Sequence, residues 1–384
     1  MVRLRRTNII VMKYYIIAGE ASGDLHGSNL IKELKKLDGG ASIRCWGGDK
    51  MQAAGGELVK HYRDLAFMGF TEVLMNLLTI LRNLKFCKED ILAYQPDTLI
   101  LIDYPGFNLR IAKWAKLNNL KVIFYISPQV WAWKENRVKM MKECIDKMLV
   151  ILPFEKDYFK NKWNWKVEYV GHPLVQVIDE FRANNPATQS AIQPPFTIAL
   201  LPGSRKQEIL KKLPIMLEVS KEFPEHNFII AKAPAVEDAF YNDLLKDYSN
   251  VSHVADQTYD LLLKANAALV TSGTATLETA LFGVPEVVCY KGSAISYQIA
   301  KRVIKVKYIS LVNLIMFRLV VHELIQDELT PKNLARELKE LLFDPKRINT
   351  LKQDYKELKE LLGEGGNASA RAATSIVNFL KGKS

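Results

Sequence analysis

The chain has 384 residues, of which 48% are hydrophobic and 25% are charged. These values are ordinary for a globular protein, and the length suffices for two domains with sizeable cores. The formal net charge of +11 favours anionic partners such as phosphorylated substrates or an anionic membrane surface. No nucleic-acid-binding motif accompanies this charge, so nucleic acid is not an expected partner.

Cysteine and histidine spacing argues against disulfides and metal sites. The four cysteines lie far apart without a C-x-x-C pair, and the six histidines form no H-E-x-x-H pair. This pattern is typical of a reducing compartment, and we expect neither a metal nor another cofactor. No stretch of about 18 uncharged apolar residues occurs, so the sequence predicts no membrane-spanning helix.

Short apolar segments alternate with amphipathic ones from the start of the chain. Residues 1–11 are interpreted as an N-terminal extension, because the apolar run at 9–12 is too short for a signal peptide. In a first domain, 12–182, we expect helices at 25–37, 65–86 and 109–117 and strands at 14–18, 43–46, 98–102, 122–126, 148–152 and 167–170. Strands that are apolar on both faces and separated by helices predict a parallel, doubly wound sheet.

A polar, proline-rich segment at 183–195 is the predicted linker. A second α/β series follows over 196–345, with strands expected at 196–201, 227–231, 251–254, 268–271 and 286–290. C-terminal helices complete the chain over 346–384. The sequence therefore predicts an α/β protein with two Rossmann-like domains facing each other across a cleft, where ligands bind beyond the carboxyl ends of the strands.

Three predicted loops between a strand and a helix have the composition of phosphate-binding turns. They contain Gly19 and Ser22; Gly203, Ser204 and Arg205; and Ser272, Gly273 and Thr274, the last followed by Glu278. Glycine permits a tight turn, and the N-terminus of a helix attracts anions. An arginine can bind a diphosphate through two parallel hydrogen bonds, and a carboxylate can accept hydrogen bonds from both hydroxyls of a ribose.

Each loop also has a simpler explanation: a plain turn, a surface arginine or an ordinary helix cap. Two such loops within one domain favour the functional interpretation. Asp103 follows the buried strand at 98–102, where its carboxylate could deprotonate a sugar hydroxyl or merely cap the next helix. The apolar stripe of the 65–86 helix fits either a core-facing helix or one that meets lipid.

Several stretches together resemble the lipid-A-disaccharide synthase family, which are inverting glycosyltransferases of the two-domain GT-B type. They are 18–24 (AGEASGD), 68–74 (MGFTEVL), 102–108 (IDYPGFN), 127–133 (SPQVWAW), 152–155 (LPFE), 171–173 (GHP), 201–205 (LPGSR), 272–274 (SGT) with Glu278, and 308–313 (YISLVN). The resemblance spans about 13–380. Two departures concern Gly106, where the family usually has Asp, and Val312, where it usually has Pro.

The resemblance implies a UDP-2,3-diacylglucosamine donor, a 2,3-diacylglucosamine 1-phosphate acceptor, and a β-1,6-linked disaccharide 1-phosphate with UDP as products. Asp103 and Arg205 are then the expected catalytic residues. The expected donor residues are Gly19, Ser22, Gly203, Ser204, Arg205, Ser272, Gly273, Thr274, Glu278 and Asn313. The expected acceptor and lipid residues are Met68, Val73, Leu74, Leu77, Leu78 and Asn108.

The resemblance further implies a metal-independent reaction and a cytoplasmic enzyme bound peripherally to the inner face of the bacterial inner membrane. Lys301, Arg302, Lys305 and Lys307 would contact anionic lipid there. The family also implies a homodimer that exchanges C-terminal segments; these helices could instead pack on the first domain. The alternatives are another GT-B UDP-sugar enzyme, such as an N-acetylglucosaminyltransferase or an epimerase, and a catalytically silent sensor or scaffold.

Overall fold

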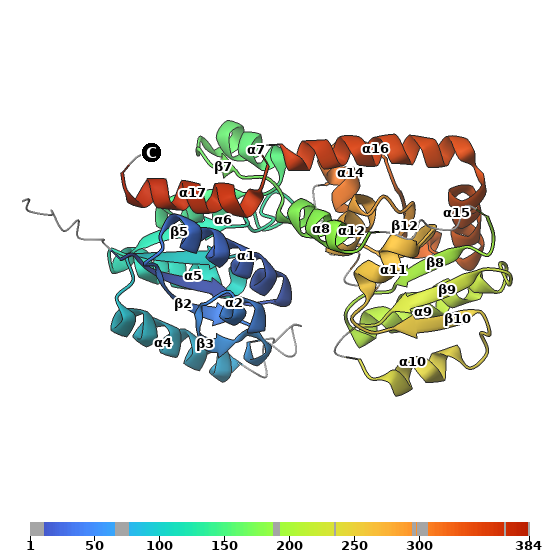
Figure 1. The fold of residues 1–384 in the computed structure, drawn as a ribbon, viewed down its shortest axis with the longest axis horizontal. Coiled ribbons are helices and arrows are strands. Elements are labelled where there is room, and N and C mark those ends of the chain that lie inside the picture. Colours follow the sequence, from blue (N-terminus) through green and yellow to red (C-terminus); the bar gives the residue numbers. More distant parts are fainter. Residues whose placement is uncertain are drawn as a thin grey trace, which may run out of the picture. The chain divides into compact units, whose positions relative to one another are not determined.

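The computed structural model describes residues 11–65, 77–186, 193–233, 236–293, 297, 306–364 and 366–382. The chain divides into two compact units, of which the first combines Met1–Pro173 with Gly363–Ser384 and the second is Leu174–Leu362. Each unit has a parallel sheet covered by helices (Figure 1). The predicted α/β class with two parallel sheets is therefore confirmed.

The sheet of the first unit has seven strands in the order β3-β2-β1-β4-β5-β6-β7. Its central strands read as uninterrupted apolar runs because helices cover both faces, and all five residues of β4 are buried. The strands are β1 (Lys13–Ala18), β2 (Ser42–Gly47), β3 (Glu57–His61), β4 (Thr98–Ile102), β5 (Lys121–Tyr125), β6 (Lys147–Val150) and β7 (Glu168–Tyr169).

The helices of the first unit come from both ends of the sequence. They are α1 (Ala21–Leu37), α2 (Asp49–Ala53), the short η1 (Tyr62–Asp64), α4 (Leu77–Tyr94), α5 (Pro105–Leu117), α6 (Arg137–Cys144), α7 (Pro153–Trp163) and α17 (Ala368–Leu380). Helix α17 packs against α1, as Figure 1 shows in red and blue. Helix α17, near the end of the chain, and α1, which follows β1, therefore pack side by side in one layer of helices.

The sheet of the second unit has six strands in the order β10-β9-β8-β11-β12-β13. They are β8 (Thr197–Leu201), β9 (Asn227–Ala231), β10 (Val251–Val254), β11 (Ala267–Thr271), β12 (Glu286–Tyr290) and β13 (His322–Ile325). The helices are α8 (Pro173–Asn184), α9 (Lys206–Ser220), α10 (Asp238–Leu245), α11 (Thr258–Lys264), α12 (Thr274–Leu281), α14 (Leu311–Met316), η2 (Gln326–Glu328), α15 (Pro331–Phe343) and α16 (Pro345–Gly363). Strand β13 has no counterpart in the sequence prediction.

The limits of the two units differ from the predicted domain limits. Helix α8 lies before the predicted linker yet belongs to the second unit, where Arg182 donates to the carbonyl of Phe282. Helix α16 was grouped with the C-terminal helices, but it also belongs to the second unit, where Arg318 forms ion pairs with Asp354 and Glu357. Specific side-chain contacts between distant segments set these limits, and composition along the chain does not show them.

Helix α4 falls on the later part of the predicted 65–86 helix. Leu65 is buried directly after η1, and residues 66–76 lie outside the described part. Met68, Val73 and Leu74 fall in that segment, and Lys301, Arg302 and Lys305 fall in another. Among the helices that the structure describes, none has the length and apolar character needed to span a bilayer.

Candidate active site

A cavity of about 270 Å³ lies at the carboxyl ends of β8 and β11 in the second unit. Six residues predicted for donor binding line it together: Gly203, Ser204, Ser272, Gly273, Thr274 and Glu278. Two parallel strands end side by side here, so the loops that follow them meet at one edge of the sheet. The lining also includes Glu208, Lys232, Thr258 and Thr271, which the sequence did not single out.

The cavity loops lead directly into helices. Arg205 is the N-cap of α9 and Gly273 that of α12, so the N-terminal ends of two helices lie beside the cavity. The Ser272 hydroxyl donates to the Ile309 carbonyl at 2.9 Å, which ties this loop to the segment before α14. Such an arrangement suits an anionic group such as a phosphate.

Glu278 faces the same cavity from α12. Its Oε1 accepts a hydrogen bond from the Tyr259 hydroxyl at 2.9 Å. Burial raises the pKa of Glu278, and this hydrogen bond opposes the rise. The hydrogen bond fixes the orientation of the carboxyl, and Oε2, which has no hydrogen-bond partner among the described residues, can accept from a hydroxyl of a ligand.

The structure does not place Arg205 in the lining of this cavity. Its side chain is 56% exposed, and its Nη1 lies 3.5 Å from Oε1 of Glu208, which does line the cavity. The guanidinium is therefore at the side of the cavity, held by an acid of the next helical turn. A long, exposed arginine can reach an anion bound at the two helix starts.

Asn313, which was predicted to bind the donor, makes internal hydrogen bonds with its side chain. Its side chain is buried, and its Oδ1 accepts from the N–H groups of Val320 and Val321. Its Nδ2 donates to the Val321 carbonyl and to Glu323. Since all these bonds are internal, Asn313 fixes the loop and has no group left for a donor in this arrangement.

Glu323 is the residue of this region that the sequence analysis missed. Its carboxylate accepts hydrogen bonds from the N–H groups of Ile309 and Ser310 at 3.0 and 2.9 Å. Together with Asn313 it holds the loop that receives the Ser272 hydroxyl. No local signal marks Glu323, because it lies in a strand that the sequence analysis did not predict.

Asp103 lies at the end of β4 in the first unit, in a turn where Asp103 and Tyr104 both have left-handed backbone angles, with φ of 45° and 47°. Burial raises the pKa of Asp103 to about 7, and the nearby Glu20 carboxylate adds to the rise. The N-cap of α5 is Tyr104, so the interpretation of Asp103 as the helix N-cap does not apply. A carboxyl with a pKa near neutrality can act as a general base.

Asn108 stabilises the turn that contains Asp103. Its Nδ2 donates to the carbonyl of Asp103 at 2.8 Å and to that of Ile102 at 3.2 Å, and the side chain is buried. Asn108 was expected among the acceptor residues and was also expected to help orient the loop of Asp103. Its contacts hold the backbone of Asp103, as the second expectation requires.

Gly19 and Ser22 were predicted for donor binding, but they belong to the first unit and do not line the 270 Å³ cavity. A Cβ on Gly19 would lie 2.3 Å from the ring of Tyr104, so only glycine allows this ring to pack there. Ser22 is exposed near the start of α1. Gly19 therefore lies next to the turn that contains Asp103.

The tryptophan-rich segment 127–133 is anchored by a buried acid. Glu155 of α7 accepts from the N–H of Trp131 at 3.3 Å and from the backbone of Leu152 at 3.0 Å. Burial raises the pKa of Glu155 to about 8, and these hydrogen bonds oppose the rise. Glu155 was part of a recognised motif, but its contact with Trp131 follows only from the tertiary structure.

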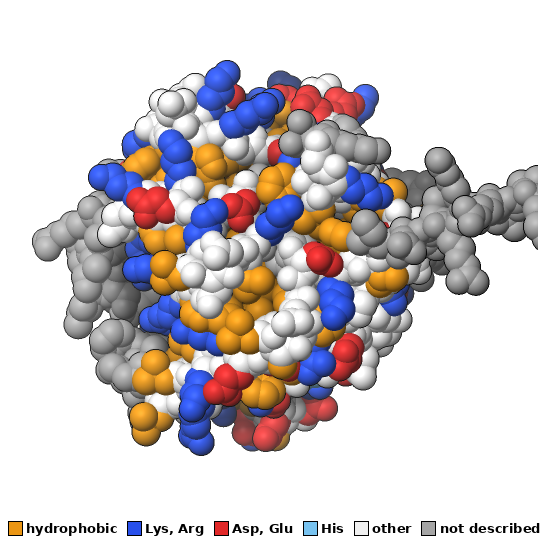
Figure 2. All heavy atoms as spheres, turned by 90° about the vertical axis from the view of Figure 1, so that its left-hand side faces the viewer, with side chains coloured by type: hydrophobic (Ala, Val, Ile, Leu, Met, Phe, Trp, Pro, Cys, Tyr) orange, Lys and Arg blue, Asp and Glu red, His pale blue; other side chains and the backbone are white. Residues whose placement is uncertain are grey.

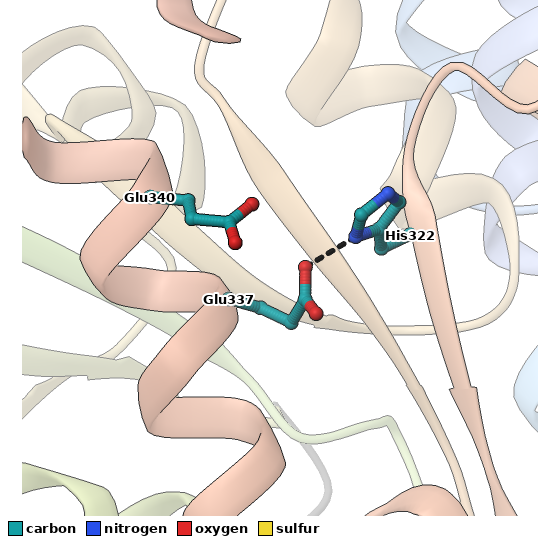
Figure 3. Close-up of side chains that lie close together, drawn as sticks. All are labelled: His322, Glu337 and Glu340. Atoms are coloured by element: carbon teal, nitrogen blue, oxygen red, sulfur yellow. Dashed lines mark hydrogen bonds and ion pairs between the residues drawn. The ribbon is translucent and has the colours of Figure 1, made fainter. Parts of the chain in front are cut away.

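A separate cluster of His322, Glu337 and Glu340 lies between β13 and α15 (Figure 3). Their ligand atoms lie within 4.8 Å of one another. His322 contacts one oxygen of Glu337, and Arg336 lies 3.0 Å from the other. Both oxygens of Glu337 thus have partners. His322 begins its strand, so the cluster lies away from the carboxyl-end loops that form the cavity.

The two parallel sheets and the cavity at the strand ends define an α/β protein of the GT-B type. Among solved structures with this fold are a UDP-N-acetylglucosamine 2-epimerase from Neisseria meningitidis bound to UDP-GlcNAc (TM-score 0.63, 14% identity, 97% of this chain and 100% of that one) and the calicheamicin glycosyltransferase CalG4 (TM-score 0.61, 17% identity, 97% and 99%). At such identities the likeness concerns the fold alone.

Sequence relatives are far closer. The profile of the family described as Lipid-A-disaccharide synthetase matches residues 14–377. The lipid-A-disaccharide synthase of Syntrophus aciditrophicus is 38% identical, over 95% of this chain and 97% of its own length. That of Geobacter metallireducens is 39% identical, over 95% and 96%. The chain belongs to the lipid-A-disaccharide synthase family, so it is a glycosyltransferase of lipid A biosynthesis.

Proposed function

We propose that the protein transfers a diacylglucosamine unit from UDP-2,3-diacylglucosamine to the 6-hydroxyl of 2,3-diacylglucosamine 1-phosphate. The new β-1,6 bond forms as the bond between the anomeric carbon and the UDP oxygen breaks, and UDP leaves. The family membership supports the reaction. The observation that carries the donor assignment is the cavity of the second unit, where two helix starts and Glu278 come together.

The donor's diphosphate would bind at the starts of α9 and α12, with Arg205 as a cation beside them. Charge develops on the leaving UDP, and donors fixed in advance stabilise such charge most effectively. Glu278 would accept hydrogen bonds from the ribose with the oxygen that does not bind Tyr259. This charge pattern supports a mechanism in which no metal is needed.

Asp103 would remove the proton from the acceptor hydroxyl as that oxygen attacks the anomeric carbon. Its raised pKa, about 7, matches a group that must accept a proton near neutral pH. Asn108 keeps its backbone in place.

Helix α4 is the described part of the proposed lipid contact. Leu78 and Leu81 are 74% and 52% exposed, and Arg82 and Lys85 follow them on the same helix. Figure 2 shows one face of the molecule on which lysine and arginine side chains are interspersed with hydrophobic ones. Apolar residues that enter the lipid and cations that meet its phosphates would support peripheral binding to the inner face of the inner membrane. A homodimer is a further part of this proposal.

The test is mass-spectrometric product analysis with UDP-diacylglucosamine and diacylglucosamine 1-phosphate. We expect a tetraacyl disaccharide 1-phosphate and UDP in equal amounts from the full chain. Asp103→Asn keeps the shape without the basicity and is expected to lower turnover by about 10²–10⁴-fold. Release of UDP and a free sugar without disaccharide would contradict the transfer, and wild-type-like turnover of Asp103→Asn would contradict the assigned base.

A further inference from the structure

Three cations lie near the edge of the first sheet where Asp103 is found. Arg110 lies in the second turn of α5, and Arg137 is the first residue of α6. Lys134 lies in the loop between β5 and α6, directly after the tryptophan-rich segment. Strands β4 and β5 are parallel neighbours, so this loop and the turn of Asp103 leave the sheet at the same edge. Arg110, Lys134 and Arg137 together form the basic cluster.

The guanidinium of Arg110 is directed back to the start of α5. Its Nη1 donates to the Gly106 carbonyl at 2.9 Å, and Gly106 follows Asp103 by three residues. Burial raises the pKa of Tyr104 and the nearby Glu20 adds to the rise, whereas the Arg110 charge opposes it. The guanidinium therefore lies close to the Tyr104 side chain, which belongs to the same turn as the proposed base.

Arg137 and Lys134 lie close to each other and to Arg110. Burial lowers the pKa of the Arg137 guanidinium, and the Arg110 charge lowers it further. Helices α5 and α6 pack against each other, in agreement with this proximity. Burial and then the Arg137 charge likewise lower the pKa of Lys134, whose Nζ lies 4.2 Å from the centre of the Trp133 ring. The basic cluster is thus a group of like charges that weaken one another.

The acidic residue nearest to the cluster in the sequence has other partners. Glu135, between Lys134 and Arg137, pairs with Lys162 and accepts a hydrogen bond from the Tyr158 hydroxyl. Among the residues that the structure describes, no carboxylate forms an ion pair with a member of the basic cluster. Like charges at close range repel, so an anion from outside the chain would stabilise this arrangement.

We propose that the basic cluster binds the phosphate of the acylated sugar acceptor, a phosphate monoester, beside Asp103. The inference rests on the proposed function and deepens it, because it assigns the contact that orients this substrate. An arginine can bind phosphate oxygens through two parallel hydrogen bonds, and a phosphate monoester carries a charge of about −1.5 to −2 at neutral pH. The Trp133 ring, 47% exposed, offers an apolar surface next to the cations. With its phosphate held there, the acceptor turns its 6-hydroxyl to Asp103 at the same edge of the sheet.

Steady-state rates with two acceptors in neutral detergent micelles test this role. The acceptors are diacylglucosamine 1-phosphate and the same diacylglucosamine without phosphate, and the ratio of their kcat/KM values is the phosphate preference. Arg137→Gln removes a charge, and we expect the phosphate preference to fall about tenfold or more, as for a lost charge-assisted hydrogen bond. Arg137→Lys keeps the charge and should retain most of the preference, and Lys134→Gln should lower it a few-fold.

Lys139→Gln is the matched control, because Lys139 is exposed on another side of α6. Its phosphate preference should equal that of the wild type. Calorimetry should give wild-type UDP affinity in all these variants, since the basic cluster and the donor cavity belong to different units. Arg137→Gln removes an uncompensated charge, so its Tm should equal or exceed that of the wild type. If Arg137→Gln fails to fold, Lys134→Gln carries the test.

The outcomes separate acceptor binding from lipid binding and from the proposed function. A wild-type phosphate preference in folded Arg137→Gln and Lys134→Gln overturns the inference, and so does a wild type that uses both acceptors equally well. Loss of binding to phosphatidylglycerol liposomes with an unchanged preference would assign the cluster to lipid headgroups instead. Equal losses with both acceptors also overturn it, because they indicate a distorted site. Failure of the wild type to form the disaccharide would refute the proposed function itself.

Discussion

The pKa of the Asp103 carboxyl is unusually high. Burial makes the larger contribution and the Glu20 charge a smaller one, and together they raise this pKa to about 7. The protonated form prevails below that pH, and a protonated carboxyl cannot act as a base. We therefore expect kcat/KM to rise with pH up to about 7 and to be about 100-fold lower at pH 5. A pH–rate profile over pH 5–9 measures this.

The Glu20→Gln variant tests whether the pKa of Asp103 sets the rising limb of that pH–rate profile. Removing the Glu20 charge lowers the pKa of Asp103, so the rising limb should move to lower pH while the plateau remains. If the rising limb of kcat/KM lies at the same pH in Glu20→Gln as in the wild type, a group other than Asp103 controls the rate there.

Arg205 is an exposed cation beside the donor cavity. Arg205→Ala should weaken UDP binding and lower turnover, because one charge-assisted contact to a phosphate contributes about 1.5–3 kcal/mol. Calorimetry and steady-state rates measure the two effects. Lys206→Ala, at the next exposed position, is the control; UDP affinity equal in Arg205→Ala and wild type would exclude contact with the diphosphate.

At the scale of elements, α4 presents leucines to solvent that a helix packed only in a core would bury. Leu78 and Leu81 are 74% and 52% exposed, whereas Leu84 and Ile91 of the same helix are buried. Leu78→Ser with Leu81→Ser should reduce co-sedimentation with anionic liposomes, because each methylene withdrawn from lipid costs about 0.8 kcal/mol. Thermal stability and UDP affinity should remain near wild type.

The control for α4 is Leu84→Ala, which removes a buried side chain of the same helix. It should lower the Tm while liposome binding per folded molecule stays unchanged. If the Leu78 and Leu81 substitutions act like Leu84→Ala, then α4 is stabilised by these leucines within the protein and does not contact lipid.

At the scale of the whole molecule, the last helix of the chain is part of the first unit. Ile376 of α17 is fully buried, and α17 packs against α1. Ile376→Ala should lower the free energy of unfolding by about 2–5 kcal/mol, as for other large-to-small core substitutions. Denaturant unfolding measures the loss, and Asn378→Ala, exposed on the same helix, should change it little.

The sequence by itself determined the α/β class, most of the strands and the loops that carry the chemistry. Apolar runs separated by amphipathic helices leave few other arrangements, and glycines before helix starts mark turns by local backbone chemistry. Six of the predicted donor residues follow two strands, β8 and β11, that the sheet places side by side. These inferences needed only near neighbours in the sequence.

Tertiary structure alone decided which side chains have their polar groups left free for a ligand. The side-chain amide of Asn313 makes internal hydrogen bonds with both its oxygen and its nitrogen, whereas the hydroxyl of Thr271, which lines the cavity, has no hydrogen-bond partner within the described chain. The grouping of α16 and α17 in different units likewise depends on contacts between distant segments. Residues far apart in the sequence bury a side chain and supply its hydrogen-bond partners, so local sequence patterns do not predict either.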